Sequence, residues 1–380
     1  MFLLRKNIKD ESYYLNLITF ITASFWLIAK LISWRVWTSY RLFPLIPPFD
    51  FLNELPSWYH LFFFAVSLIS LVFLIIKPSS KIAGLLIISE LFSLIADQNR
   101  WQPWEYQYLF IMLLLSFNKK PQHYFSLGVK VIIISIYFYS GVSKLNPGFL
   151  RSVWSGMLLR GFFEIININA NTPIIYYAGY AIGLIEIICA AGLFFKRTKK
   201  ITALILIAVH CFNLLVLGPF GINYNVIVWP WNVAMIAYLY ILFIHSPAIT
   251  YNLDDFKKGW NKLVIVCWFI LPMFNLFGWW DNYLSSVLYS GKLKEMVICV
   301  KKGDDTFTKS LEPYYSDDHR NICNGDKMIL VTKWAMKEMK VPVYPERRVY
   351  LKIKEVFIQK YNLPETTCFL FYMNQKEELK

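Results

Sequence analysis

The sequence predicts an all-α polytopic membrane bundle of about eight or nine helices, followed by a small C-terminal α+β domain outside the membrane. The 380-residue chain is 57% hydrophobic and only 17% charged, which is too apolar for a soluble enzyme. Long apolar runs recur as far as about residue 281, and shorter strand-like and amphipathic segments replace them beyond it. We therefore assign residues 1–287 to a transmembrane domain and residues 288–380 to a tail domain.

The predicted spans are apolar runs of about 15 to 24 residues, the length that crosses a bilayer core. The third and fourth runs are short, and some aromatic-rich runs have poorly defined ends, so a total of eight spans remains an alternative. The first contains Lys30 and ends without a small-residue cleavage site, which indicates an uncleaved span. The runs lie near residues 14–33, 58–76, 82–96, 105–118, 127–145, 173–195, 201–217, 222–245 and 262–281.

Basic residues are distributed unevenly between the alternate connections. Fourteen lie on one side and five on the other, so the positive-inside rule predicts a cytoplasmic N-terminus and, with an odd number of spans, an extracytoplasmic tail. The net charge of +14 is thereby explained as a topology signal, and we expect no nucleic-acid partner. The richer side holds Arg5, Lys6, Lys9, Lys77, Lys81, Lys119, Lys120, Lys196, Arg197, Lys199, Lys200, Lys257, Lys258 and Lys262; the poorer side holds Arg35, Arg41, Arg100, Arg151 and Arg160.

The tail has the pattern of a small folded unit. Strands are expected at 296–300, 328–331 and 367–372, and a helix between Pro345 and Pro364. Its apolar face comprises Val349, Ile353, Val356, Phe357 and Tyr361. In an extracytoplasmic tail, one disulfide can form among Cys299, Cys323 and Cys368, with one thiol left over. No cysteine has zinc-ligand spacing, so we expect no metal site.

The outer loops are expected to be 34–57, 97–104, 146–172 and 218–222, and they are rich in proline and tryptophan. Apolar residues within 149–167 recur at helical spacing, with Arg151 and Arg160 between them. This pattern is typical of an interfacial helix, which could cover a cavity. The apolar positions are Phe149, Trp154, Met157, Leu158, Phe162, Phe163 and Ile166.

Lys144 lies at the outer end of the fifth run, within Tyr137-Phe-Tyr-Ser-Gly-Val-Ser-Lys-Leu-Asn-Pro147. A lysine at the bilayer centre costs roughly 2.5 to 3.5 kcal/mol on the lower scales, which marks it as a functional candidate. The alternative is that its long side chain extends to the headgroup level. Glu186 and His210 lie in later apolar runs and Glu90 in the third. A paired or protonated Glu and a packing His are the alternatives to function there.

A polar turn, Asp97 to Tyr108, separates the two short runs. Two interpretations remain open: Asp97 and Arg100 pair across an aromatic belt, or the turn forms a cavity wall. Asn213, Asn223, Asn225 and Asn232 lie near a Gly/Pro break at the outer end of the eighth run, where a simple kink is the alternative. Because the topology puts all these groups in the outer half of the bundle, we expect one shared polar cavity in which Lys144 acts as a base.

The segment around Lys144 resembles the one in vitamin K-dependent gamma-carboxylase and its bacterial relatives that carries the lysine proposed as the active-site base. Lys144 falls on that lysine. The positions Asp97, Trp101, Tyr106 and Tyr108 match the family's Asp…Trp…Tyr-x-Tyr turn. The likeness covers about residues 10–285, known as the horizontally transferred transmembrane (HTTM) domain, and extends to His210 and Asn213, which resemble the family's His-x-x-Asn helix.

The resemblance implies a multi-pass protein of a bacterial inner membrane that uses a reduced quinone. In the family, oxygenation of the quinone yields a base strong enough to abstract a carbon-bound proton, and glutamate is carboxylated. This chain has Gln102-Pro103-Trp104 where the family has Asn-His after the turn's tryptophan, and it lacks the large propeptide-binding region. We therefore carry over only the base role of Lys144 and do not expect glutamate carboxylation.

The candidate catalytic residues are Lys144 as base, with His210 and Glu186 orienting groups or relaying protons. The candidate substrate-binding residues are Asp97, Arg100, Trp101, Tyr106, Tyr108, Tyr139, Asn213 and Asn225. The expected ligand is a quinone-like or lipid-like molecule from the outer leaflet. Two other readings stay open: a quinone-linked redox partner of the DoxX/MauE type, which the lack of a Cys-x-x-Cys pair disfavours, and a noncatalytic scaffold whose tail docks a protein partner.

Overall fold

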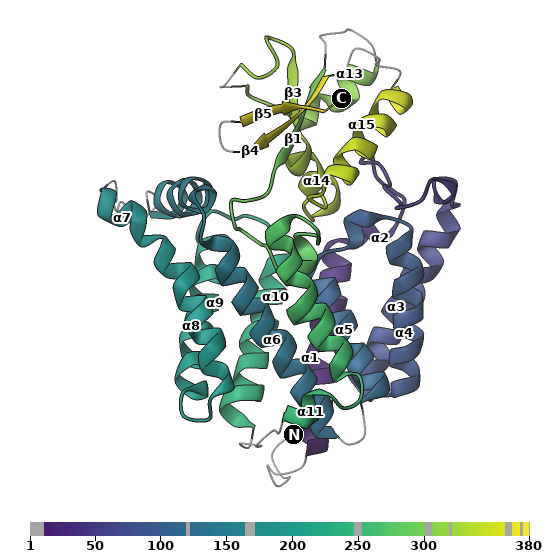
Figure 1. Cartoon of the computed structure of the whole chain (residues 1–380). Helices are drawn as coiled ribbons and strands as arrows, with labels where there is room; N and C mark the ends of the chain where they lie inside the picture. Colours follow the sequence, from purple (N-terminus) through teal and green to yellow (C-terminus); the bar gives the residue numbers. More distant parts are fainter. Residues whose placement is uncertain are drawn as a thin grey trace.

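A bundle of helices forms the larger part of the molecule, and a small sheet-containing domain lies at one end of it (Figure 1). The computed structural model describes residues 11–118, 122–163, 172–246, 253–300, 306–318, 321–361, 367–372 and 375–379. Of the residues used above for orientation, Arg5, Lys6, Lys9, Lys119 and Lys120 lie outside these ranges, as do residues 164–167 of the expected interfacial helix.

Each of the nine apolar runs coincides with a helix or with consecutive helical segments in the described chain. In order, these are α1 (Glu11–Ile32), α3 (Ser57–Ile76), α4 (Ser80–Ile95), α5 (Pro103–Phe117), α6 (Gln122–Lys144), α7 (Pro173–Ala178) with α8 (Tyr180–Phe194), α9 (Lys199–Leu217), α10 (Val228–Leu239) with η4 (Tyr240–His245), and α12 (Asn261–Ile265) with η5 (Val266–Ile270) and η6 (Leu271–Phe277). Shorter helices are α2 (Trp34–Trp37), η1 (Asp50–Leu52), η2 (Gln98–Arg100), α11 (Leu253–Phe256) and η7 (Tyr283–Ser285).

Within the part of the chain that the structure describes, six helices are long and apolar enough to cross a membrane: Ser12–Ile32, Ser57–Ile76, His123–Lys144, Pro173–Phe194, Lys199–Leu217 and Val228–His245. The segment Asn261–Phe277 is apolar but shorter. α4 and α5, with 16 and 15 residues, are about 24 and 22 Å long, below the roughly 30 Å of a bilayer core. These features identify a multi-pass membrane protein, and the total of eight or nine spans remains a prediction.

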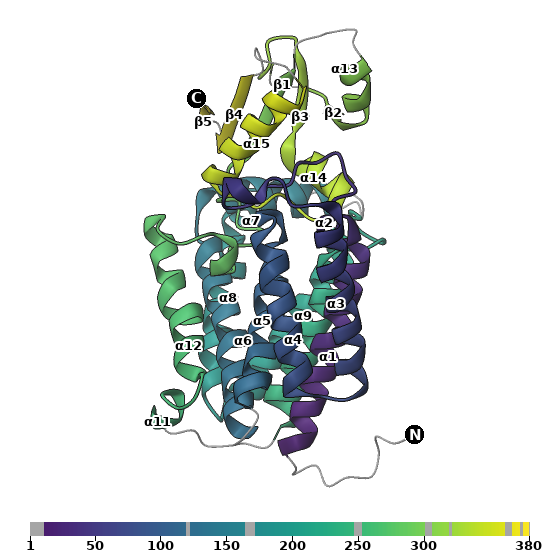
Figure 2. The ribbon, with the colours of Figure 1, turned by 90° about the vertical axis from the view of Figure 1, so that its right-hand side faces the viewer.

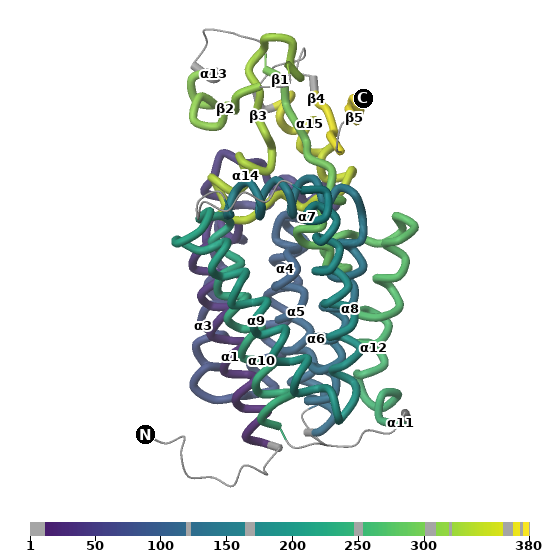
Figure 3. The backbone as a smooth tube through the Cα atoms, turned by 90° about the vertical axis from the view of Figure 1, so that its left-hand side faces the viewer, coloured from purple at the N-terminus to yellow at the C-terminus, as the bar shows by residue number. Residues whose placement is uncertain are grey.

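α6 is the central helix of the bundle. Residues Val129, Ile132 and Ile133 are fully buried, and α6 packs against α1, α5, α8 and α12. α12 lies at the edge of the bundle (Figure 2). The connection that contains α2 lies at the end of the bundle that faces the sheet domain, as the alternating topology predicted (Figure 1). α7, which begins the sixth run, lies at the same end (Figure 3). Lys144 ends α6 at this same end.

The tail forms a five-stranded antiparallel sheet in the order β2-β3-β1-β4-β5. Its strands are β1 (Glu295–Val300), β2 (Tyr315–Ser316), β3 (Lys327–Leu330), β4 (Thr367–Tyr372) and β5 (Gln375–Glu378). β1, β3 and β4 confirm the three predicted strands. β1 lies between β3 and β4, with Ile298 opposite Ile329 and Cys368, and it is buried along most of its length.

The tail also contains the helices α13 (Thr306–Leu311), η8 (Glu312–Tyr314), α14 (Val331–Met339) and α15 (Arg347–Tyr361). α14 lies between the sheet and the bundle (Figure 1). α15 confirms the predicted helix, since Val349, Ile353 and Phe357 are buried and Phe357 meets Trp334 of α14 edge-to-face. α14 was not predicted, because it starts directly after β3 and its short sequence lacks a capping signal.

A disulfide joins Cys299 of β1 to Cys323, which confirms one bridge among the three tail cysteines. Cys368 is the remaining thiol and is buried in β4. Burial raises the pKa of the Cys368 thiol to about 12, so it stays protonated and cannot attack the bridge at neutral pH.

Replacing Cys299 and Cys323 together by Ala should destabilise the tail by about 3 kcal/mol, because the bridge closes a loop with a sequence separation of 24 residues. Thermal unfolding of the purified chain measures the loss. Cys211→Ala, which removes an exposed thiol, is the control and should leave the midpoint unchanged. An unshifted midpoint in the double variant would contradict a stabilising bridge.

Candidate functional site

The site begins with an unusually close approach of α6 and α8. A Cβ added to Gly141 would lie 2.7 Å from the carbonyl oxygen of Gly183, and one added to Gly183 would lie 2.8 Å from the carbonyl oxygen of Gly141. Each glycine precedes a charged residue by three positions, Lys144 on α6 and Glu186 on α8. Because residues three apart share a helix face, the glycine contact brings the two charges together.

Lys144 and Glu186 form a buried ion pair. Lys144 Nζ donates to Glu186 Oε2 at 2.7 Å and to Ser140 Oγ at 2.5 Å. Only about a tenth of either side chain is exposed, at 10% and 9%. The idea that Lys144 extends to the headgroup level is therefore wrong, because its ammonium turns inward to a carboxylate. The pair also answers the question left open for Glu186, which is partnered.

His210 of α9 belongs to a chain of three buried polar side chains. Its Nδ1 lies 2.7 Å from Asn232 Oδ1, and its Nε2 lies 2.7 Å from Tyr137 Oη. Asn232 Nδ2 donates to Val228 O, which directs its Oδ1 toward the imidazole. A neutral His210 then carries its hydrogen on Nδ1, and Nε2 accepts from the Tyr137 hydroxyl.

Both groups face a cavity of about 360 Å³ between α6, α8, α9, α10 and η3 (Phe149–Phe163). Lys144, Glu186, His210 and Asn213 line it, together with Tyr137, Ser140 and Asn232. Most of the remaining wall is aliphatic or aromatic, including Trp154, Met157, Phe163, Trp231 and Met235. A mostly apolar cavity with a few convergent polar groups is the usual form of a small-molecule site.

The cavity reaches the outer surface of the bundle between α8 and α9. Ile185 and Phe212 line it and are 40% and 37% exposed on the apolar flank of these helices. η3 closes the end that faces the sheet domain with Phe149, Trp154 and Leu158. η3 confirms a helix at 149–163, wound as a π-helix. A hydrophobic molecule could therefore enter sideways from the lipid.

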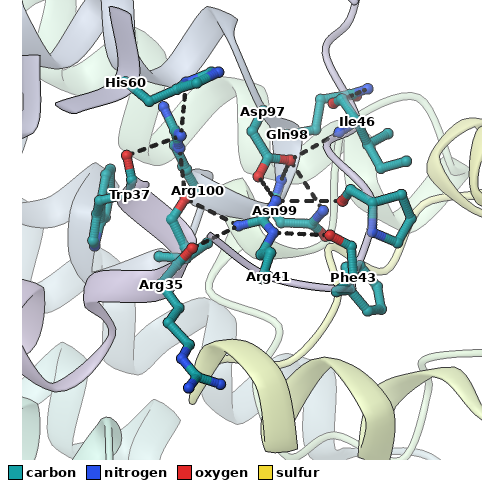
Figure 4. A network of polar contacts seen from close by, with 12 residues as sticks. Arg35, Trp37, Arg41, Phe43, Ile46, His60, Asp97, Gln98, Asn99 and Arg100 are labelled. Atoms are coloured by element: carbon teal, nitrogen blue, oxygen red, sulfur yellow. Dashed lines mark hydrogen bonds and ion pairs between the residues drawn. The ribbon is translucent and has the colours of Figure 1, made fainter. Parts of the chain in front are cut away.

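Asp97 and Arg100 do not line this cavity, and they do not pair with each other. Asp97 pairs with Arg41 and accepts from Asn99 and from the backbone N–H of Ile46 (Figure 4). Arg100 donates to the carbonyls of Val36, Ser93 and Trp37 and lies 3.1 Å from His60 Nδ1. Both are fully buried. They hold the segment after α2 in place, so their expected position in the cavity is wrong.

The polar turn that contains Asp97 instead docks the tail domain. Gln102 Nε2 donates to Pro342 O, Asn99 Oδ1 accepts from Tyr344 N, and Gln98 Oε1 accepts from Arg348 Nε at 2.9 Å. Trp101 also belongs here, with its ring edge-to-face against Tyr344. Of the two interpretations of the turn, neither holds, because protein from the tail covers it.

Four further candidate binding residues, Tyr106, Tyr108, Tyr139 and Asn225, also lie outside this cavity. Tyr106 donates to Cys267 O at 3.1 Å, and Tyr139 donates to Phe269 O, so both tie the bundle to the ninth run. Tyr108 is fully buried beside Trp26, and Asn225 Nδ2 donates to Tyr289 Oη at 2.8 Å. Of the eight predicted binding residues, the cavity contains Asn213.

Sequence reasoning placed Asn232 among the expected polar groups of the cavity but did not single out Tyr137 and Ser140. A usable signal was the repeated pattern Gly141-x-x-Lys144 and Gly183-x-x-Glu186, in which a small residue precedes a charge by one helical turn. Tyr137 lies seven positions before Lys144, so both share the α6 face that lines the cavity.

A second buried charged cluster lies on the other side of the bundle. Lys30 Nζ of α1 donates to Glu90 Oε2 at 3.0 Å and lies 3.9 Å from Glu105 Oε2, and Trp26 Nε1 donates to Glu105 at 2.6 Å. Lys30 also lies 3.1 Å from the centroid of the Trp37 ring. Within the described chain, one carboxyl oxygen of each Glu has no hydrogen-bond partner.

Comparison of the chain with protein-family models, curated proteins and solved structures finds no match. The family resemblance drawn from the residues around Lys144 therefore remains a hypothesis.

We predict that Lys144 and Glu186 are energetically coupled. Lys144→Ala or Glu186→Ala alone should destabilise the protein by about 3 kcal/mol, because each leaves a buried group without its partner. The double variant should lose less than the sum, by at least about 1 kcal/mol. Thermal unfolding in detergent measures all three. The exposed pair Lys257–Asp254 is the control and should show coupling below about 0.5 kcal/mol. Additive losses at Lys144 and Glu186 would disprove the pairing.

In the Lys30 cluster, two carboxyls share one ammonium, so full ionisation would leave a net buried negative charge. We expect Glu105, the carboxyl farther from Lys30, to hold the proton. Glu105→Gln, which mimics the protonated acid, should cost under about 1 kcal/mol, whereas Glu90→Gln should cost about 2 kcal/mol or more. Infrared spectroscopy should show a protonated-carboxyl band that Glu105→Gln removes. A band that survives this change would overturn the assignment.

Proposed function

We propose that this chain is a membrane-embedded enzyme that acts on an amphiphilic, quinone-like or lipid-like molecule in the cavity beside Lys144. The observation that carries the proposal is that all three predicted catalytic side chains, Lys144, Glu186 and His210, line one largely apolar cavity. Its exposed rim at Ile185 and Phe212 suits a substrate that arrives from the lipid. Lys144 serves as the base, with Glu186 as its partner.

The ion pair supplies a route for the proton. Lys144 as an ammonium has no free electron pair, so it must pass a proton to Glu186 before it can accept one. At 2.7 Å the transfer needs no rearrangement, and the pair stays neutral overall whichever atom holds the proton. A pair that changes no net charge is suited to a dry cavity, where a lone charge would be expensive.

His210 is proposed as an orienting or relay group. Tyr137 donates to its Nε2 and Asn232 accepts from its Nδ1, so a proton taken up at Nε2 would come through the tyrosine hydroxyl. The chain of short hydrogen bonds holds the imidazole in one orientation. Tyr137 faces the cavity, and its hydroxyl oxygen could accept a hydrogen bond from a substrate hydroxyl.

A reduced quinone is the cofactor that the family resemblance implies, and the cavity has the chemistry to hold one. Trp154, Met157 and Trp231 would pack against a ring or isoprenoid chain, while Asn213 and Ser140 offer hydrogen bonds to ring oxygens. The quinone would supply redox chemistry when bound. Lys144 and Glu186 would hold and move the proton beside it.

We propose further that the tail is extracytoplasmic, with the N-terminus in the cytoplasm of a bacterium. The Cys299–Cys323 bridge supports this side, because disulfides persist in oxidising compartments. The uneven distribution of basic residues supports the same orientation. The cavity would then open to the outer leaflet, beside the tail.

The base role predicts that Lys144→Arg stops proton abstraction, because a guanidinium keeps the charge but cannot give up its proton at neutral pH. The test is incorporation of deuterium from D₂O into carbon positions of the amphiphile that co-purifies with the chain, followed by mass spectrometry with added menaquinol. The rate should fall at least about 100-fold in Lys144→Arg and in Glu186→Gln. Lys258→Arg, at an exposed lysine far from the site, is the control and should exchange normally.

Exchange at an undiminished rate in Lys144→Arg would overturn the base assignment. A wild-type protein that exchanges nothing would favour the noncatalytic scaffold. Thermal unfolding of each variant shows whether a lost rate reflects lost folding, since Lys144→Arg keeps a cation beside Glu186 and should remain folded.

A further inference from the structure

A second cavity, of about 460 Å³, lies between η3 and the tail domain. Arg151, Ser152 and Arg160 of η3 line one side, and Lys294, Glu295 and Tyr350 of the tail line another. The lining is far more polar than that of the first cavity and carries three cationic side chains against one acidic one. Such a compartment is suited to an anion.

The two cavities are neighbours. Leu288 and Tyr289 line both of them, so one side of each residue faces the apolar cavity and the other faces the cationic one. η3 borders both cavities, because Val153, Trp154 and Met157 face the first while Arg151 and Arg160 face the second. One helix therefore lies along both the apolar and the cationic cavity.

A close backbone contact holds the start of η3 in place. A Cβ on Gly148, next to the start of η3, would lie 2.3 Å from Gly291 O, and Gly291 has a φ of +63° that favours glycine. Asn146 Nδ2 donates to Ser290 O at 2.9 Å just beside it. The start of η3 is thus fixed to the linker that leads into β1, and Lys144 lies only four residues before Gly148.

Arg160 is the cation with the most capacity for a ligand. Its Nε donates to Ser155 O at 3.3 Å, and among the described residues no carboxylate forms an ion pair with it. Lys294, by contrast, is paired with Glu377 at 2.7 Å. A guanidinium presents a planar fork of N–H donors that matches the oxygens of a phosphate or carboxylate.

We infer that the natural ligand is an anionic amphiphile whose phosphate or carboxylate head binds in the second cavity, at Arg160, while its chain occupies the first. This assignment rests on the proposed function, because it takes the first cavity as the site for an apolar chain. To the proposed function, this inference adds the charge of the ligand's head group and identifies Arg160 as the residue that selects this head group. Lys144 and Glu186 would then lie beside the part of the molecule that joins head to chain.

The test measures binding of three probes to the full chain in nonionic detergent, by native mass spectrometry and thermal shift. Dodecyl phosphate has head and chain, dodecanol has the chain alone, and inorganic phosphate has the head alone. We expect dodecyl phosphate to bind at least about tenfold more tightly than either of the others. Arg160→Gln should remove that advantage and leave dodecanol binding unchanged, because Arg160 is exposed and its loss should not disturb folding.

Two variants complete the design. Arg197→Gln removes an exposed arginine in the α8–α9 connection and should leave all three probes unaffected. Met157→Trp narrows the first cavity and should weaken the binding of dodecyl phosphate and of dodecanol alike.

Inorganic phosphate that binds as tightly as dodecyl phosphate would point to a free anion as the ligand and overturn the assignment of an amphiphile. Dodecanol that binds as tightly as dodecyl phosphate overturns the head assignment but leaves the proposed function standing. Binding of no probe overturns both.

Discussion

The contact between Gly141 and Gly183 is the constraint on which the site depends. Without side chains at these two positions, α6 and α8 approach until the backbone of one nearly touches the backbone of the other. Lys144 and Glu186 follow one turn later on the same faces, and their 2.7 Å contact requires that approach. The pair and the cavity beside it depend on how closely these two helices cross.

Buried charges in the described part of the bundle are either paired or, as at Arg100, satisfied by backbone carbonyls. Lys144 pairs with Glu186, Lys30 with Glu90, and Asp97 with Arg41, each across different segments of the chain. An ion removed from water without a partner would cost several kcal/mol, so each group must be matched. The three clusters differ in whether a ligand can reach them. The Lys30 and Asp97 clusters are fully buried, whereas the Lys144 pair faces a cavity that reaches the lipid side. Access to a ligand distinguishes the candidate site from the two structural clusters.

The tail domain completes the bundle by covering its polar end. The turn at residues 97–102 follows a helix too short to span a bilayer core and exposes side-chain amides that need partners. Pro342, Tyr344 and Arg348 supply those partners. The tail also closes the second cavity against η3. A short tail can thus form part of a ligand site without contributing to the reacting pair.

The amino-acid sequence by itself determined the helix positions, three tail strands, the tail helix and the presence of a disulfide, because these follow from local hydrophobic periodicity and residue chemistry. It also identified Lys144, Glu186 and His210 as unusual, since an ionisable residue in an apolar run is visible locally. Only the tertiary structure decided which charges meet. Asp97 pairs with Arg41 and not with Arg100, which is nearer in the sequence, because the segment after α2 folds back over the turn. Partner choice depends on distances between helices that no local pattern encodes, and it moved seven of the eight expected binding residues out of the cavity that holds the three catalytic candidates.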